Sequence, residues 1–144
     1  MKLEVWKDIQ NYPNYQVSNY GNVKSKERLT NVGIKNQKQC LRKERLLKQQ
    51  KDHKGYLYVR LYNVNGFKSI KVHKLVAQTF IENKENKPTI DHIDRNKENN
   101  NVDNLKYADY KEQIINRNID MELVKENMSK LGKSGIGLKV RYGK

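Results

Sequence analysis

Hydrophobic and polar residues alternate most regularly between Tyr56 and Tyr62. Every second residue from Leu57 to Leu61 is aliphatic, and the residues between them are polar or aromatic, which predicts a half-buried β-strand. The Asn65-Gly66 pair is typical of a tight two-residue turn, so Phe67 to Val72 is expected to return as the partner strand. The sequence therefore predicts a β-hairpin near the middle of the chain.

The spacing of apolar residues changes directly after this hairpin. From Val72 to Phe80 they recur at helical spacing, as on one face of a helix. This pattern predicts an amphipathic helix over His73 to Ile81 that packs on the hairpin. A charged stretch and Pro88 follow, and they are expected to end the helix.

The remaining elements are short and are separated by turn residues. Before the hairpin, aromatic and β-branched runs interrupted by Pro, Asn and Gly predict brief strands. After the helix, two short strands flank a polar turn, and Asp109 with Glu112 forms a capping box that opens a further helix. The expected strands are Tyr15–Ser18, Asn22–Ser25, Ile90–Ile93 and Leu105–Tyr107, and the expected helices run from Asp109 to about Arg117 and from Met121 to Leu131. The basic, Gly-rich residues 133 to 144 are expected to be mobile without a bound partner.

The charge of the chain indicates a polyanionic partner. There are 30 Lys and Arg residues against 16 Asp and Glu, which gives a formal net charge of +14. Neutralising phosphates releases condensed counterions, so this charge favours nucleic acid, although basic ribosomal and structural proteins share it. From Lys24 to Lys54, eleven basic residues stand against three acidic ones. This segment is either a solvated loop or a DNA-facing surface, and the sequence leaves both open.

Cysteine content and hydropathy limit where the chain is expected to act. Cys40 is the single cysteine, so neither an intrachain disulfide nor a cysteine-based zinc site can form. The charged N-terminus lacks the apolar segment of a signal peptide, and no window approaches the roughly 18 apolar residues of a membrane span. These features predict a soluble, intracellular protein in a reducing compartment, with no membrane association.

Acidic, imidazole and amide groups gather around the expected strands at 90–107. Hydrolysis of a phosphodiester requires a base that activates water and a cation that neutralises the charge developing at the phosphate. A hard divalent cation retains several waters and needs few protein ligands, typically a carboxylate and one further oxygen. Asp91 and the amide oxygen of Gln113 can supply that pair. His92 can face the attacking water from across the phosphate.

At this point the chain resembles a known family. Residues Ile90–Lys97, Asn99-Asn100 and Asp103–Leu105 are similar to the core of the HNH homing endonucleases of phages and their introns. Residues Lys71–Phe80 are similar to the helix that leads into that core. The first part of the chain resembles the nuclease-associated modular motif that accompanies such cores, at Val5–Ile9, Tyr15–Asn19, Gly21–Ser25, Leu46–Lys48 and Gly55-Tyr56. The matches together cover roughly residues 4 to 118, and the combination is more specific than either half.

The resemblance implies a ββα-metal nuclease core in which each polar group has a role. His92 would be the general base, Asp91 a metal ligand, and Asn104 a side chain that braces the loop bearing His92. The implied cofactor is a divalent metal, Mg²⁺ or Mn²⁺, and the implied products carry a 5′-phosphate and a 3′-hydroxyl. For His73, a structural role such as a hydrogen bond to the core loop is expected.

Two residues depart from the family pattern. The second metal ligand of the family is an Asn about one turn into the following helix, and Gln113 occupies that position with its oxygen one methylene further out. Misplacement by about an ångström can cost on the order of 100-fold in rate. Asn116, on the same face, is a weaker alternative ligand. Arg95 stands where the family usually has Gly, so this turn residue either avoids positive φ or adopts it at some cost.

The expected fold is α+β: a basic antiparallel sheet module over 1–70, an HNH nuclease core over 71–118 and a basic helical tail over 119–144. Its expected partner is double-stranded DNA, with no protein partner evident. A monomer would nick one strand, a homodimer would cut both, and a phage-encoded chain would act in the cytoplasm of a bacterial host. The alternatives are a DNA-binding protein on the HNH fold that is catalytically impaired, or, more distantly, a basic RNA-binding or ribosome-associated protein. The residues expected to contact DNA are Lys24, Lys26, Arg28, Lys48, Arg60, Lys71 and Arg117.

Overall fold

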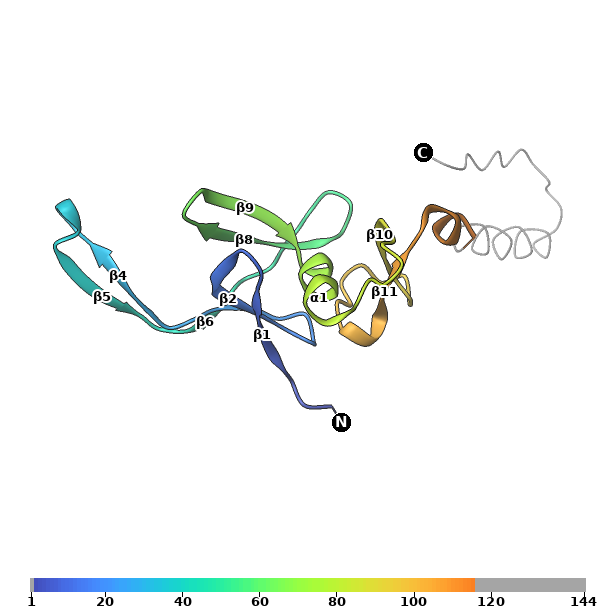
Figure 1. The fold of residues 1–144 in the computed structure, drawn as a ribbon, viewed down its shortest axis with the longest axis horizontal. Coiled ribbons are helices and arrows are strands. Elements are labelled where there is room, and N and C mark those ends of the chain that lie inside the picture. Colours follow the sequence, from blue (N-terminus) through green and yellow to red (C-terminus); the bar gives the residue numbers. More distant parts are fainter. Residues whose placement is uncertain (1, 116–144) are drawn as a thin grey trace, which may run out of the picture. The chain divides into compact units, whose positions relative to one another are not determined.

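The computed structural model describes residues 2–115 (Figure 1). The chain divides into two compact units, Met1–Tyr107 and Ala108–Lys144. The described part combines small antiparallel sheets with few helices, the α+β class that the sequence predicts. None of the helices in this part is long and apolar enough to cross a membrane. The helix expected at Met121–Leu131 and the basic residues that follow it lie outside the described residues.

Four strands near the N-terminus form an antiparallel sheet in the order β1-β2-β3-β6. They are β1 (Trp6–Ile9), β2 (Tyr12–Ser18), β3 (Val23–Ser25) and β6 (Arg45–Leu46). β2 and β3 confirm the two strands predicted here. Tyr15, Val17 and Val23 are buried on the inner face of this sheet, whereas the more polar strand β1 gave no clear pattern in the sequence.

The basic segment after β3 contains a second hairpin that was not predicted. Strands β4 (Arg28–Val32) and β5 (Lys38–Arg42) pair through the short 3₁₀ turn η1 (Ile34–Asn36). None of these residues is buried, and Figure 1 shows the hairpin extending away from the other strands. Since charged and polar residues dominate both strands, they bury no apolar face that the sequence pattern could mark.

The hairpin and helix in the middle of the chain are confirmed almost residue for residue. Strands β7 (Gln50–Lys51), β8 (Leu57–Asn63) and β9 (Gly66–Lys71) form a three-stranded antiparallel sheet. Gly66 opens β9 with a φ of 118°, a conformation that glycine adopts without strain. Helix α1 (Val72–Phe80) follows directly, one residue out of register with the prediction.

One hydrophobic core joins residues from both sheets and from α1. Helix α1 contacts β1 and β2 on one side and β8 and β9 on the other, and it also contacts β10 (Thr89–His92). Burial of its apolar face therefore fixes β10 against the N-terminal sheet. The core consists of Ile9, Tyr15, Val17, Val23, Val59, Leu61, Val72, Leu75, Val76 and Leu105.

Two short strands and a capped helix complete the described part. β10 pairs with β11 (Leu105–Ala108), which confirms both predicted strands, and the 3₁₀ turn η2 (Val102–Asn104) immediately precedes β11. In the second unit, the backbone N–H of Asp109 donates to Glu112 Oε2 at 2.9 Å, and that of Glu112 donates to Asp109 Oδ1 at 2.8 Å. This reciprocal pair is the predicted capping box, and residues 110–115 are helical.

Candidate functional site

Asn104 ties together the loop that joins β10 to β11. Its Oδ1 accepts a hydrogen bond from the backbone N–H of Asp94 at 3.0 Å. Its Nδ2 donates to Asp94 Oδ1 and to the backbone oxygen of Asn99, both at 2.8 Å. Asn104 is buried, so these bonds replace the water that its amide would otherwise bind. They fix the backbone directly after His92.

The same loop holds Asp94 as a carboxylate. Hydrogen bonds from the Asn99 side chain, the Asn96 backbone and the Asn104 side chain lower the pKa of Asp94, because each donor favours the charged form. The next residue, Arg95, has a φ of 64°, so it adopts the left-handed backbone that a glycine would adopt more easily. Of the two possibilities that the sequence left open for Arg95, the structure has the strained one.

His92 lies at the end of β10 and is almost fully buried. Its Nε2 is 2.8 Å from Oδ1 of Asn100, which is buried as well. Asp91 precedes it in the strand and is half-buried. The structure thus brings His92, Asp91 and the bracing residue Asn104 into one strand-loop-strand unit.

Two aromatic rings pack around His92. The His73 ring meets it edge-on with centroids 5.1 Å apart, and Tyr56 lies 5.2 Å from His73 and 6.0 Å from His92. Burial lowers the pKa of His73 to about 4, and the neighbouring His92, Lys71 and Lys74 add to the shift. Among the described residues, Nδ1 of His73 has no hydrogen-bond partner. His73 therefore packs against His92, and its Nδ1 makes no hydrogen bond to the described residues of the core loop.

The metal ligands expected from the sequence belong to different units. Asp91 is in β10, whereas Gln113 lies in the second unit, where its backbone N–H donates to the Asp109 oxygen at 3.1 Å. Carboxylate and amide oxygens are hard donors of the kind that Mg²⁺ and Mn²⁺ bind, so the donor chemistry fits such an ion. Residues 2–115 contain no group of three or more His, Cys, Asp or Glu that could hold a metal. Asn116 lies outside the described residues.

Three of the lysines expected to contact DNA form ion pairs within the chain. Lys24 is the least accessible, because its side chain is 15% exposed and its ammonium lies 4.4 Å from the centroid of the Trp6 ring. Lys48 is exposed, and Arg117 lies outside the described residues. The pairs are Lys24 with Glu44 at 3.2 Å, Lys26 with Asp8 at 3.3 Å and Lys71 with Asp52 at 3.5 Å.

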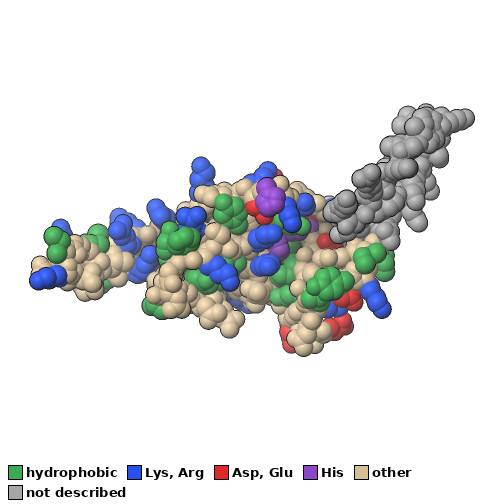
Figure 2. Space-filling model, turned by 90° about the horizontal axis from the view of Figure 1, so that it is seen from above, with side chains coloured by type: hydrophobic (Ala, Val, Ile, Leu, Met, Phe, Trp, Pro, Cys, Tyr) green, Lys and Arg blue, Asp and Glu red, His purple; other side chains and the backbone are tan. Residues whose placement is uncertain are grey.

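A basic groove of about 640 Å³ is lined mainly by β4, β5 and β8. Two of the predicted DNA contacts, Arg28 and Arg60, line it, and no acidic residue does. Figure 2 shows Lys and Arg side chains distributed over the hairpin at the left and over the neighbouring surface. Sequence reasoning missed Arg42, Lys43 and Arg45 of this groove individually, although the charge density of the segment marked the region.

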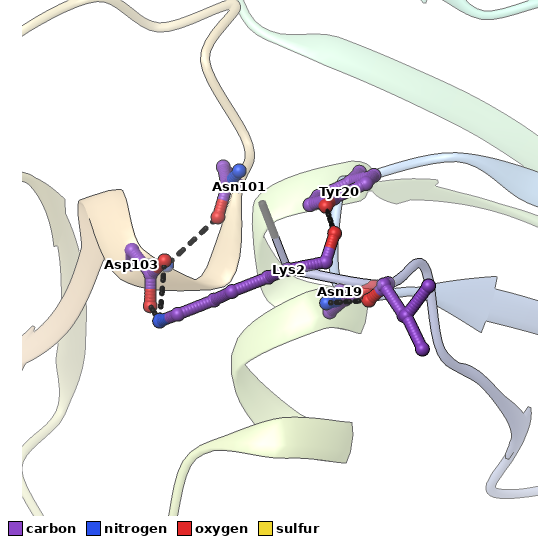
Figure 3. A network of polar contacts seen from close by, with 6 residues as sticks. Lys2, Asn19, Tyr20, Asn101 and Asp103 are labelled. Atoms are coloured by element: carbon purple, nitrogen blue, oxygen red, sulfur yellow. Dashed lines mark hydrogen bonds and ion pairs between the residues drawn. The ribbon is translucent and has the colours of Figure 1, made fainter.

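Sequence reasoning also missed the contacts that the N-terminal residues make beside the nuclease loop. Lys2 forms an ion pair with Asp103 at 2.9 Å, and the hydroxyl of Tyr20 donates to the Lys2 backbone oxygen (Figure 3). The side chain of Asn19 donates to the Leu3 backbone oxygen at 3.1 Å. Lys2 and Asp103 are 101 positions apart in the chain, so no local pattern could indicate that they meet.

Comparison with known proteins defines the class to which this fold and site belong. Residues 4–62 match the NUMOD4 motif. The structure resembles a solved one described as "DNA binding and cleavage by the HNH homing endonuclease I-HmuI", with a TM-score of 0.64 and 33% identity over 88% of this chain and 66% of that one. The chain belongs to the HNH endonuclease family and carries a NUMOD4 motif before its HNH region.

Particular relatives come from viruses. DNA endonuclease I-HmuI of Bacillus phage SP01 is 34% identical over 113 residues, which are 78% of this chain and 56% of the relative. H-N-H endonuclease F-TflII of Escherichia phage T5 is 35% identical over 107 residues, 73% of this chain and 48% of the relative. An uncharacterized HNH endonuclease, L245 of Acanthamoeba polyphaga mimivirus, is 37% identical over 74% of this chain and 28% of its own length. The chain thus spans about half or less of most of these relatives.

Proposed function

We propose that this chain carries the catalytic centre of a DNA endonuclease that hydrolyses phosphodiester bonds with the help of a divalent metal ion. The observation that carries the proposal is the arrangement around His92. Its buried ring is hydrogen-bonded within a loop that Asn104 braces, and Asp91 is adjacent. The relatives named as DNA and HNH endonucleases support the same class of reaction.

In the proposed reaction, His92 removes a proton from the water that attacks the phosphate, which requires the neutral ring with a free lone pair. The oxygens of Asp91 and Gln113 would hold Mg²⁺ or Mn²⁺. When bound, this ion neutralises charge on the phosphate and on the leaving 3′ oxygen. The bond between phosphorus and the 3′ oxygen breaks, so the products carry a 5′-phosphate and a 3′-hydroxyl.

The proposed substrate is double-stranded DNA, held in part by the basic groove. Guanidinium groups bind phosphate oxygens with two parallel hydrogen bonds, and Arg28, Arg42, Arg45 and Arg60 bring four of them to the groove. Because no acidic side chain lines the groove, no anion in its wall competes with a phosphate. One catalytic centre per chain nicks one strand, and a homodimer would cut both.

Nicking of supercoiled plasmid in Mg²⁺ or Mn²⁺ tests this proposal. We expect the wild-type chain to convert plasmid to the open circular form, and we expect chelation of the metal to stop the conversion. His92→Ala and Asp91→Ala should each reduce the rate by at least about 100-fold, because each removes a group that acts at the phosphate. If His92→Ala nicks plasmid at the same rate as the wild type, the assigned role of His92 is wrong.

The variant Gln113→Asn distinguishes an active endonuclease from the principal alternative, a DNA-binding protein with an impaired HNH site. Restoring the shorter amide should raise the nicking rate, by up to about 100-fold if Gln113 displaces the metal by an ångström. Gln78→Asn, the same change on the exposed side of α1, is the control and should leave the rate unchanged. Duplex binding without cleavage, even after Gln113→Asn, would favour a DNA-binding protein with an impaired HNH site.

A further inference from the structure

The contact between His92 and Asn100 determines which atom of the imidazole can act as the base. Both side chains are buried, with 5% and 4% of their surface exposed, and Nε2 of His92 is 2.8 Å from Oδ1 of Asn100. A carboxamide oxygen only accepts hydrogen bonds, so this contact is a hydrogen bond when Nε2 of His92 carries the proton. In the neutral ring, Nδ1 is then the nitrogen with the free lone pair.

Asn100 is itself fixed by a close backbone contact with the turn between β2 and β3. Gly21 in this turn has a φ of 86°, and a Cβ added there would lie 2.9 Å from both the Cβ and the backbone oxygen of Asn100. Such a distance is shorter than van der Waals contact allows, so the two segments can approach only because Gly21 has no side chain. The backbone of the turn at Gly21 therefore packs directly against Asn100.

Hydrogen bonds hold this turn against the nuclease loop. The backbone N–H of Val102 donates to the Asn19 oxygen at 2.8 Å. On the other side of the turn, the Gln49 side chain donates to the Gly21 oxygen at 2.7 Å. The ion pair between Lys2 and Asp103 adds a further link beside the same loop (Figure 3). The NUMOD4 segment thus contacts the loop that carries His92 through its backbone, and its Lys51 also forms an ion pair with Glu98 of that loop.

We propose that Asn100 is a positioning residue that holds the Nε2–H of His92 and leaves Nδ1 as the catalytic base, and that the Gly21 turn of the NUMOD4 segment fixes Asn100 for this purpose. The inference rests on the proposed role of His92 as general base. It assigns the NUMOD4 segment a part in catalysis that does not depend on its contacts with DNA.

The position of the ring proton can be read by NMR without substrate or metal. In ¹⁵N-labelled protein at a pH where the ring is neutral, we expect a slowly exchanging His92 proton on Nε2. The signal is assigned by its loss in His92→Gln. Asn100→Leu, which keeps the size but removes the acceptor, should abolish the slow exchange, and Asn100→Asp, which keeps an acceptor oxygen, should retain it. A proton on Nδ1 in the wild type, or an unchanged signal in Asn100→Leu, would overturn the proposal.

Kinetics then show whether this contact matters for the reaction. Asn100→Leu should lower kcat by about 100-fold with little change in KM, and Asn100→Asp should stay within about tenfold of the wild type. Asn65→Leu makes the same change at an exposed position in the turn between β8 and β9, and it should alter kcat by less than about threefold. Equal losses in Asn100→Leu and Asn65→Leu would contradict a specific role for Asn100. If the wild type retains the Nε2 proton but does not nick DNA, the proposed function fails and the assigned contact stands.

The role of the turn is tested with a pair of glycine variants. Gly21→Ala and Gly66→Ala both place a side chain at positive φ, but the added Cβ meets Asn100 only at Gly21 and open space at Gly66. We expect Gly21→Ala alone to lower kcat and to remove the slowly exchanging His92 proton, while both variants keep wild-type affinity for duplex DNA. If the two variants reduce kcat equally, the turn contributes only general stability and this part of the proposal is wrong.

Discussion

At the scale of single residues, the site depends on asparagine side chains that act as braces for the backbone. Asn104 closes the loop after His92 with three hydrogen bonds, and Asn100 contacts the ring of His92 itself. A carboxamide is suited to this use because it donates and accepts at once and carries no charge to desolvate. Neutral amide groups therefore supply the contacts that hold His92 and the backbone directly after it.

Removing the Asn104 amide should destabilise the loop and slow cleavage together. Asn104→Ala leaves the backbone N–H of Asp94 and the oxygen of Asn99 without their partner, which costs about 2 kcal/mol in the free energy of unfolding. Urea unfolding measures this cost, and plasmid nicking measures the effect on the reaction. Asn86→Ala, at an exposed position away from the loop, is the control. A change below about 0.5 kcal/mol in Asn104→Ala would contradict the bracing role.

His73 should make stability depend on pH in the weakly acidic range. Its pKa is about 4 in the folded chain and rises to the ordinary value of 6.5 on unfolding, so the unfolded state takes up the proton first as the pH falls. The free energy of unfolding is therefore expected to decrease from pH 6.5 down to about 4, by at most about 3 kcal/mol. The measurement is urea unfolding across this range for the wild type and His73→Gln, with His53→Gln as the same change at an exposed position. An identical pH dependence in the wild type and His73→Gln would refute this account.

At the scale of elements, the sequence predicted the strands and helices that bury an apolar face. Val59 and Leu61 alternate in β8 and Val76 falls at helical spacing in α1 because these side chains are buried. The periodic pattern of apolar residues in the sequence is therefore a consequence of burial. The hairpin of β4 and β5 buries no residue, and the sequence of this segment predicts either a solvated loop or a DNA-facing surface. An element that buries no side chain in the core has no reason to show the periodicity of a core.

The exposed face of that hairpin suggests how it would read a DNA sequence. Leu29 is paired with Leu41 and Asn31 with Gln39 on one face of the hairpin, and Arg28 is paired with Arg42 on the other. Asn31 and Leu41 also reach the basic groove that Arg28 and Arg42 line. A two-stranded ribbon fits the major groove, where amide side chains match adenine and apolar ones match the thymine methyl group.

We therefore expect this face to contribute sequence preference rather than general affinity. Asn31→Ala combined with Gln39→Ala should reduce the preference among duplexes selected from a random library, with affinity for unselected duplex changed by less than about threefold. Arg42→Gln, which removes a positive charge from the groove, should weaken binding to the selected and to the unselected duplexes. An unchanged preference in the double variant would show that the bases are read elsewhere.

At the scale of the whole molecule, the net charge of +14 predicts that the affinity for duplex DNA falls steeply as the salt concentration rises. Replacing two arginines of the groove that we propose bind phosphates, Arg42→Gln with Arg45→Gln, should reduce the slope of log affinity for DNA against log salt by about 2. The double variant of Lys84 and Lys87 to Gln removes the same charge from side chains that pair with Glu82 and Glu85. It should leave the slope nearly unchanged, and equal effects of the two double variants would mean that net charge alone controls binding.

The sequence by itself determined the α+β class, the β8–β9 hairpin, α1, the capping box and the family, because each depends on residues close together in the chain. His92, Asp91 and Asn104 were within its reach for the same reason, since twelve residues separate His92 from Asn104. Only the tertiary structure decided that Asn100 is buried against His92 and that Gly21 stands behind it, about eighty residues earlier. Contacts between distant segments form when both segments bury side chains in a shared core. The apolar periodicity of one segment shows which of its faces is buried, but it does not show which other segment that face will contact.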